Sequence, residues 1–203
     1  MNLANSLAVI LTLVVFFVSL KTMRKTVFNA KSLARIGVVA AMTIVLYMIK
    51  IVPFPQGGGC SLLSILPIMI LSVVFGMEEG IICAIVVAFT KIIIQPPYYL
   101  MQLPLDYFGA MISVAFTPMF GTVKKSRLVA GAGLAVLLST FFSVLSGVIF
   151  FGQYAPEGMN VWVYSIMYNY LGYGVEAFLS VVVLAILPLK VFRKINNKSR
   201  VEV

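Results

Sequence analysis

The sequence predicts an all-α integral membrane protein. Of its 203 residues, 62% are hydrophobic and 10% are charged, whereas soluble domains average about 45–50% apolar and about 25% charged residues. The mean hydropathy is +1.08, and short basic segments separate long apolar stretches. Because lipid offers the backbone no hydrogen-bond partner, each long apolar stretch is expected to be a helix. This composition excludes a secreted disulfide domain, a soluble enzyme and a disordered tail.

Seven apolar stretches predict helices, since a span needs about 20 apolar residues. They cover residues 3–20, 34–52, 61–76, 79–95, 104–121, 127–151 and 163–189. The stretch at 79–95 is short for a span and the stretch from residue 61 carries Pro67, so we expect these two helices to be tilted or kinked. Clusters of Gly and Pro, which end helices, interrupt the chain at residues 53–59, 95–99 and 152–160.

The first stretch fits either a signal peptide or a helix that stays in the protein. No basic residue precedes it and the positive charges follow it, which favours an uncleaved helix with its N-terminus outside. We therefore expect three parts. An extra N-terminal helix with a basic linker covers residues 1–30, a six-helix membrane domain covers 31–190, and a basic cytoplasmic tail covers 191–203.

The basic residues predict the orientation of the chain. Thirteen of the fifteen lie at residues 21–35, 124–127 and 190–200, in segments that a seven-helix arrangement places on one side. Cytoplasmic loops carry an excess of Lys and Arg, so we expect this side and the C-terminus to be cytoplasmic and the N-terminus to be outside. The formal charge of +9 then reflects topology, and no nucleic-acid partner is expected. The Gly- and Pro-rich breaks face outward, with Lys50 and Lys91 near their rims.

The sequence offers little for catalysis or metal binding. It has no His, the commonest proton shuttle and metal ligand, and no GxxxxGK[ST] loop for ATP. Cys60 and Cys83 have neither zinc-ligand spacing nor a disulfide pattern. The adjacent Glu78 and Glu79 are expected in a solvated cytoplasmic turn. We therefore expect no enzymatic activity, no cofactor and no metal site.

Two acidic residues could lie among the helices. A transporter that couples to protons or sodium usually has ionisable residues there, and of the six acidic residues only Glu176 and Asp106 are candidates. A stand-alone secondary transporter, with Glu176 as its coupling acid, therefore stays open as an alternative.

Aromatic and small polar residues near the outer breaks predict a ligand pocket. Ser143, Gly147, Phe151 and Tyr154 follow one another at i, i+4, i+8 and i+11, which places them on one helical face that ends at the outer loop. The last stretch opens with further aromatic and amide residues, namely Trp162, Tyr164, Tyr168 and Asn169. An aromatic belt at the membrane interface is the alternative explanation, although a belt needs neither an acid nor an amide.

An acidic residue follows Pro104 near the same outer end. Asp106 and Tyr107 stand in the first turn of their stretch, where the carboxylate either complements the helix dipole or faces the pocket. Aromatic faces attract cations and stack on flat rings, one carboxylate offsets one positive charge, and an amide can bond the edge of a ring. With Asp106 in the pocket, the expected ligand is small, flat, rich in nitrogen and cationic.

A pair of small residues marks the second stretch. Gly37 and Ala41 are spaced as small-xxx-small, a pattern that lets another helix approach closely in lipid. The pair fits either packing within this chain or a surface for a partner protein.

The residues around the last outer break resemble a known family. The most specific part is the run SGVIFFGQYAPEGMN at 146–160, followed by WVYS at 162–165 and by Asn169; shorter matches are LDY at 105–107, GGCS at 58–61 and PI at 67–68. From about residue 34 to residue 189, the chain resembles the thiamine-specific substrate-binding (S) component of energy-coupling factor (ECF) transporters.

The resemblance implies a six-helix S-component bundle, to which the first helix would be additional. It implies a subunit that captures thiamine from outside, works with a membrane coupling protein and two cytoplasmic ATPases, and topples in the membrane to release the vitamin inside. By the same resemblance, Gly37 and Ala41 would contact the coupling protein. The ligand-binding residues that it implies are Asp106, Tyr107, Phe151, Tyr164 and Asn169, with Phe54 and either Tyr98 or Tyr99 as candidates for further aromatic contacts.

Ser143 departs from the family pattern. It stands where the family commonly places a ligand-contacting His, and Asp106 is one methylene shorter than the Glu of some members. The smaller side chain at 143 leaves room for a bulkier or differently substituted ring. A related heteroaromatic, such as the pyrimidine precursor of thiamine, is therefore the alternative ligand, and a membrane scaffold without a ligand is a further alternative function.

Overall fold

The computed structural model describes residues 3–24, 29–192 and 194–195. Some charges used for the expected topology, at Lys25, Arg193, Lys198 and Arg200, lie outside the described residues, as does most of the basic tail expected at 191–203.

The described chain is mostly helical. Its α-helices are α1 (Leu3–Met23), α2 (Ala30–Met48), α3 (Leu66–Phe75), α4 (Met77–Ile94), α5 (Ala110–Ala115), α6 (Lys125–Phe150), α7 (Val161–Asn169) and α8 (Val175–Ile186). Two π-helices, η3 (Leu103–Gly109) and η5 (Tyr170–Gly174), run directly into α5 and α8. The remaining elements are the short helices η1 (Pro55–Gly57), η2 (Leu100–Gln102) and η4 (Gly152–Tyr154) and the strands β1 (Lys50–Pro53) and β2 (Gly59–Ser61).

Four helical stretches of the described chain are long and apolar enough to cross a membrane. They are Leu3–Met23, Ala30–Met48, Lys125–Phe150 and Val161–Ile186. The expectation of a helical protein with several apolar spans is thus confirmed. The stretches predicted at 61–76 and 104–121 form shorter helices, because strand β2 and turns take up residues 59–65 and further turns follow Ala115. Helix α4 includes Glu78, Glu79 and Lys91, which lower its apolar character.

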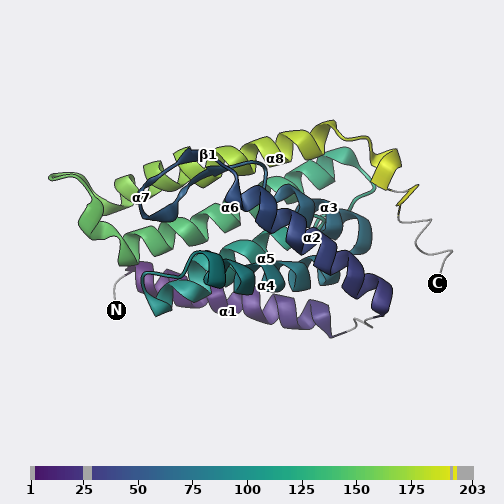
Figure 1. Ribbon diagram of the computed structural model, residues 1–203, viewed down its shortest axis with the longest axis horizontal. Coiled ribbons are helices and arrows are strands. Elements are labelled where there is room, and N and C mark those ends of the chain that lie inside the picture. The colour runs from purple at the N-terminus through teal and green to yellow at the C-terminus, as the bar shows by residue number, and fades with distance from the viewer. Residues whose placement is uncertain (1–2, 25–28, 193, 196–203) are drawn as a thin grey trace.

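The helices form an elongated bundle (Figure 1). Helix α1 packs against α4, α6 and η3 along one edge, and α7 and α8 follow the opposite edge. The end of α1, the start of α2 and the end of α8 lie at one end of the bundle, and the start of α7 lies at the other. Lys125 Nζ donates a hydrogen bond to the carbonyl of Leu187, which brings the start of α6 to the end of α8. The described parts of the three basic segments are therefore gathered at a single end.

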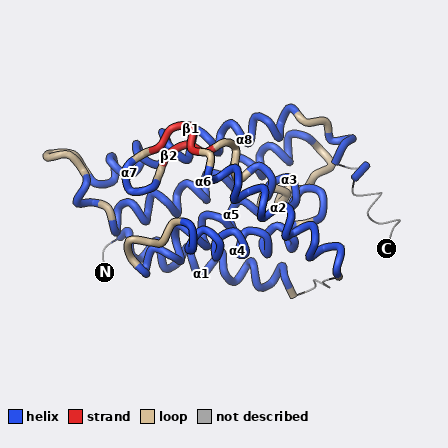
Figure 2. Tube along the Cα trace, viewed as in Figure 1, coloured by secondary structure: helices blue, strands red, loops and turns tan. Residues whose placement is uncertain are grey.

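A small β-hairpin replaces the end of the helix predicted at 34–52. Strands β1 and β2 pair antiparallel, with Val52 opposite Cys60 and Pro53 opposite Gly59, and Figure 2 shows them as one short patch of strand on the helical bundle. At Gly59 the backbone φ is +123°, and a Cβ there would lie 2.2 Å from the carbonyl oxygen of Val52. Glycine is required by this close approach, so the Gly-rich break forms the return of a hairpin instead of an irregular loop.

The start of α2 is fixed by polar contacts upstream of the apolar stretch. Asn29 Oδ1 accepts a hydrogen bond from the Ser32 backbone N–H at 2.8 Å, and the Asn29 N–H donates to Ser32 Oγ at 3.1 Å. This reciprocal capping satisfies two N–H groups that the helix leaves free. The helix therefore begins at Ala30, before the stretch predicted from residue 34.

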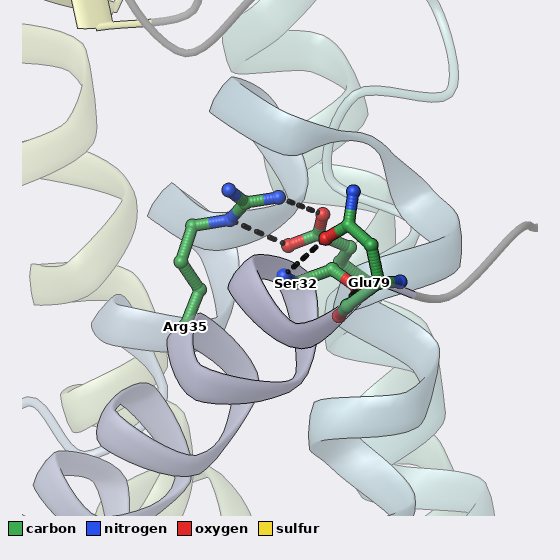
Figure 3. Close-up of polar contacts among 4 residues, drawn as sticks. Ser32, Arg35 and Glu79 are labelled. Carbon is green, nitrogen blue, oxygen red and sulfur yellow. Dashed lines mark hydrogen bonds and ion pairs between the residues drawn. The ribbon is translucent and has the colours of Figure 1, made fainter. Parts of the chain in front are cut away.

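An ion pair joins α2 to α4 one turn after this cap (Figure 3). Arg35 donates from Nε to Glu79 Oε2 at 3.2 Å and from its terminal nitrogen to Oε1 at 2.5 Å. The guanidinium also lies over the ring of Phe75, 4.2 Å from its centroid. Glu79 is 8% exposed, so the expectation of a solvated turn is wrong for this residue, because the fold supplies a bidentate partner from a neighbouring helix.

The core lies among α3, α4, α5 and α6. Ile68, Met69, Ile81, Leu128 and Phe142 are fully buried there. Large apolar residues on the outer faces are exposed, including Phe17 on α1 and Phe178 on α8. Lipid would cover such faces in a membrane protein.

Candidate ligand-binding site

A cavity lies between the hairpin and the surrounding helices. About 1010 Å³ of space that no atom fills lies within it, open solvent at its mouth included. Its walls come from α2, α4, η3, α6, α7 and the junction of η5 with α8, and residues 56–59 and 61 of the hairpin contribute to it. Segments far apart in the sequence thus meet around one space.

The cavity gathers most of the residues that the sequence singled out. These residues come from η3, from α6 and the position directly after it, and from α7. The predicted site residues that line it are Asp106, Tyr107, Ser143, Phe151, Tyr164 and Asn169, and Gly147 and Tyr168 line it with them.

The other predicted aromatic residues lie behind this lining. The rings of Tyr98 and Tyr99 contact the ring of Phe151 edge-on, at centroid distances of 5.9 and 6.0 Å. Phe54 packs edge-on against Tyr168 at 5.4 Å. Tyr154, at the end of the predicted α6 face, is 44% exposed and does not line the cavity.

Asp106 is held in place by donors from two elements. Gln102 donates to Asp106 Oδ2 at 2.9 Å, and Ser146 of α6 donates to the same oxygen. The residue belongs to η3, where Pro104 occupies the first turn. π-Helical turns are rare and often occur at functional sites, and this one aims the carboxylate across the bundle at α6.

Asn169 faces the cavity where α6 and α7 approach closely. Its Nδ2 donates to the carbonyl of Ser165 at 2.9 Å and to that of Ser143 at 3.3 Å. A Cβ at Gly147 would lie 2.1 Å from Ser165 Oγ and 3.3 Å from Asn169 Nδ2. Gly147 therefore permits the contact that positions the amide.

Hydrogen bonds tie the hairpin to the helices. Tyr47 donates its hydroxyl to Gln95 Oε1, and Gln95 Nε2 donates to the carbonyl of Gly57 at 3.2 Å. Tyr107 donates its hydroxyl to the Gln95 carbonyl at 2.6 Å. From the opposite wall, Tyr168 donates to the carbonyl of Pro55. The hairpin is thus fixed as a cover over the cavity.

Glu176 lines the cavity, but its carboxylate accepts hydrogen bonds from the end of the hairpin and the turn after it. It is 1% exposed. Its Oε2 accepts from the Ser61 N–H at 2.9 Å, and its Oε1 accepts from the N–H and the hydroxyl of Ser64 at 2.6 and 2.5 Å. Three donors from Ser61 and Ser64 therefore bond the carboxylate of Glu176, the residue considered in the sequence as the coupling acid of a secondary transporter.

Several lining residues were missed as site residues in the sequence. They are Tyr47, Lys50, Ser64, Lys91, Gln95, Gln102 and Tyr173. A signal existed for the two lysines, because they are the basic residues that stand apart from the three basic segments. No such signal marked Tyr47 or Gln95, which reach the cavity only through the packing of α2 against α4.

Comparison with known proteins identifies the family. A family model described as thiamine transporter protein matches residues 33–196. The thiamine transporter ThiT of Bacillus subtilis is 30% identical over 70% of this chain and 83% of that protein. ThiT of Lacticaseibacillus paracasei is 29% identical over 38% of this chain and 42% of that protein.

A solved structure adds the likeness of fold. The structure of ThiT from Listeria monocytogenes has a TM-score of 0.68 and 20% sequence identity, and the match covers 81% of this chain and 96% of that chain. The resemblance inferred from the motif at 146–160 is confirmed, and the relatives are named as transporters, not as enzymes. The chain belongs to the thiamine transporter protein family.

Proposed function

We propose that this chain is the substrate-binding component of an ECF-type vitamin importer and that it binds thiamine in the cavity under the hairpin. The observation that carries the proposal is the convergence of Asp106, Asn169 and several aromatic rings on one cavity. Membership of the thiamine transporter family supports thiamine as the ligand.

The proposed orientation follows from charge. The described basic segments gather at the end of the bundle where α8 ends, and such segments face the cytoplasm. The hairpin and the start of α7 would then face outward, with the N-terminus outside and the C-terminus inside. Helix α1 precedes the family match at 33–196, which supports its assignment as an addition to a six-helix domain.

The proposed binding mode assigns one role to each kind of side chain. The Asp106 carboxylate offsets the positive charge of the thiazolium ring. Phe151 and Tyr164 contact the flat rings through their faces, and Asn169 bonds the edge of the aminopyrimidine. Tyr107 and Ser143 complete the wall, while Phe54, Tyr98 and Tyr99 support the lining rings from behind.

The proposed energy source lies outside this chain. Its sequence has no phosphate-binding loop for ATP, so a membrane coupling protein and two cytoplasmic ATPases would drive release. Gly37 and Ala41 on α2 would contact the coupling protein. A Cβ at Gly37 would meet no heavy atom within 4 Å, and Ala41 is exposed, so this face is open for a partner helix.

The first test is binding by the purified full chain without ATP. We expect thiamine to quench Trp162 or tyrosine fluorescence saturably, since Phe151 and Tyr164 line the cavity near this single tryptophan. The pyrimidine precursor serves as a competitor. Tighter binding of the precursor than of thiamine would change the assigned ligand, and no response to either compound would contradict the proposal and favour a scaffold.

A stand-alone secondary transporter is the competing function. It needs Glu176 as a coupling acid, yet three donors of the hairpin loop occupy that carboxylate. Liposomes that contain only this chain decide between the two. We expect no thiamine accumulation in them, whereas uptake that Glu176→Gln abolishes would support the secondary transporter.

A further inference from the structure

The cavity carries as many positive as negative side chains. Two carboxylates, Asp106 and Glu176, and two ammonium groups, Lys50 and Lys91, line it. No salt bridge joins any of these four groups. Their charges therefore act through the cavity itself, and a ligand placed there is exposed to all four at once.

Lys50 and Glu176 are linked through one residue of the hairpin. Lys50 Nζ donates a hydrogen bond to Ser61 Oγ at 3.1 Å, and the Ser61 N–H donates to Glu176 Oε2 at 2.9 Å. Ser64 donates two further hydrogen bonds to Glu176. Both charged groups are thus held by hydrogen bonds to the hairpin or to the turn after it.

Lys91 has no comparable hydrogen bonds. Its Nζ lies 4.5 Å from the ring centroid of Tyr47 and 5.6 Å from that of Tyr107, the residue directly after Asp106. Ring faces attract cations, but they do not satisfy the three N–H donors of an ammonium group. No hydrogen-bond acceptor within the described chain contacts Lys91 Nζ. Lys91 is therefore a positive charge near the proposed binding acid that the described chain holds only through ring contacts.

Lys91 and Asp106 interact through their charges. The ammonium group and the carboxylate attract each other without direct contact. A cationic ring that binds at Asp106 is attracted by the carboxylate but repelled by the ammonium group. At an effective dielectric constant of about 20, two unit charges about 10 Å apart change a binding constant by roughly tenfold. A ring without charge is nearly unaffected by either group in this way.

We propose that Lys91 is a tethered counter-ion of Asp106 and that the cationic ring of the vitamin competes with it for the carboxylate. The inference rests on the proposed function. Lys91 then lowers the affinity of the cavity for cations and speeds their release, while the affinity for uncharged rings stays nearly the same. In this role Lys91 sets the preference between charged and uncharged ligands without donating a hydrogen bond to either.

The test removes the charge of Lys91 in the purified full chain. Lys91→Met keeps an unbranched apolar side chain but loses the ammonium group, so thiamine should bind about tenfold more tightly, mainly through slower dissociation. Binding of the uncharged pyrimidine precursor should change by less than about threefold. Lys91→Arg keeps the charge and should not show the gain. Lys124→Met, at an exposed site outside the cavity, is the matched control. Fluorescence titration gives the affinities, and stopped-flow fluorescence gives the dissociation rates.

The dependence on charge separates a counter-ion from a structural role. Thermal unfolding in detergent checks that each variant folds, and Lys91→Gln takes the place of Lys91→Met if the latter does not. Thiamine binding that stays unchanged or weakens in the uncharged variant would overturn the inference. An equal gain for the precursor, or the same gain in Lys91→Arg, would also overturn it, because charge would then not be the cause. Failure of wild type to bind thiamine at all would instead contradict the proposed function itself.

Discussion

At the scale of single residues, Asp106 is the centre of the proposed chemistry. It lines the same cavity as two rings of α7 and receives hydrogen bonds from Gln102 and Ser146. Gln102 and Ser146 both donate to Oδ2, and these two hydrogen bonds orient the carboxylate. No Lys or Arg within the described chain forms an ion pair with Asp106. A carboxylate in such a setting gains strongly from a cationic ligand, because the attraction acts in a cavity that excludes much of the solvent.

Replacing this acid tests its proposed role. Asp106→Asn keeps the shape and removes the charge, so binding of thiamine should weaken by about 1–3 kcal/mol, the scale of a charged hydrogen bond. Fluorescence titration or calorimetry measures the change. Glu157→Gln, an exposed acid of the loop between η4 and α7, is the control. Unchanged affinity in Asp106→Asn would mean that the carboxylate only complements the helix dipole and does not bind the ligand.

Helical spacing explains which site residues were accessible from sequence. Ser143, Gly147 and Phe151 repeat at four-residue intervals, so the sequence alone places them on one helical face. Glu176 and Lys91 were visible as charges in apolar stretches, but their roles depend on contacts with residues more than forty positions away. Spacing within one helix carries no information about such partners.

At the scale of elements, the crossing of α6 and α7 shapes the site. Gly147 lies against Ser165, whose hydroxyl donates to the Val144 carbonyl at 2.7 Å. Asn169 sits one turn further along α7 and bonds back to Ser165 and Ser143. Small residues at such crossings let helices approach closely in lipid, and here that approach sets the position of the amide that we propose to bind the ligand.

A methyl group at this crossing should be costly. Gly147→Ala would place Cβ 2.1 Å from Ser165 Oγ, so we expect a loss of about 1–3 kcal/mol in stability from overpacking and weaker thiamine binding. Gly133→Ala, on the same helix with no heavy atom within 4 Å of the new Cβ, should be neutral or slightly stabilising. Thermal unfolding in detergent and ligand titration measure both variants, and equal behaviour of the two would refute the close approach.

The ion pair between α2 and α4 predicts a second effect at this scale. Glu79→Gln leaves the Arg35 guanidinium without its bidentate carboxylate. It should lower the stability by about 1–3 kcal/mol, because the pair is partly buried and the Glu79 side chain is largely so. Glu78→Gln, at the adjacent position without a described ion pair, should change the melting temperature much less. Similar losses in both variants would argue against a specific role for Glu79.

The hairpin shows where element prediction from sequence fails. Apart from the charge of Lys50, residues 49–52 continue the apolar stretch, and the Gly- and Pro-rich break begins only at Pro53, so the sequence predicts a helix up to residue 52. The helix ends at Met48 because β1 finds a partner in β2, and Glu176 and Gln95 hold the resulting hairpin from other helices. Tertiary contacts override local preference in such segments.

At the scale of the whole molecule, the two proposed functions are separated along the bundle. The cavity and its hairpin cover occupy the region next to α7, while the described basic segments gather where α1 and α8 end. Between them, α2 carries the open face around Gly37. Ligand capture and the proposed contact with a coupling protein therefore depend on different surfaces of the same chain.

Variants of the α2 face should separate transport from binding. Gly37→Trp together with Ala41→Trp places bulk on the proposed partner face, so we expect thiamine uptake by cells that supply the coupling protein and ATPases to fall at least tenfold. Binding by the purified variant should stay within about twofold of wild type, because neither residue lines the cavity. Gly133→Trp, at another open helical position, is the control. Equal loss of uptake in the control would remove the support for this face.

The two π-helices give the binding wall an unusual sensitivity to chain length. Each wide turn lets one extra residue fit within a continuous span. One of them, η3, contains Asp106, and the other, η5, directly follows Asn169. Removing a single residue from either turn would convert it to ordinary α-helix and rotate the side chains on one side of it by about 100°. A one-codon deletion would thus change which groups line the cavity while leaving the length of the helix almost unaltered. We expect such a deletion to alter the ligand preference in a way that point substitutions do not.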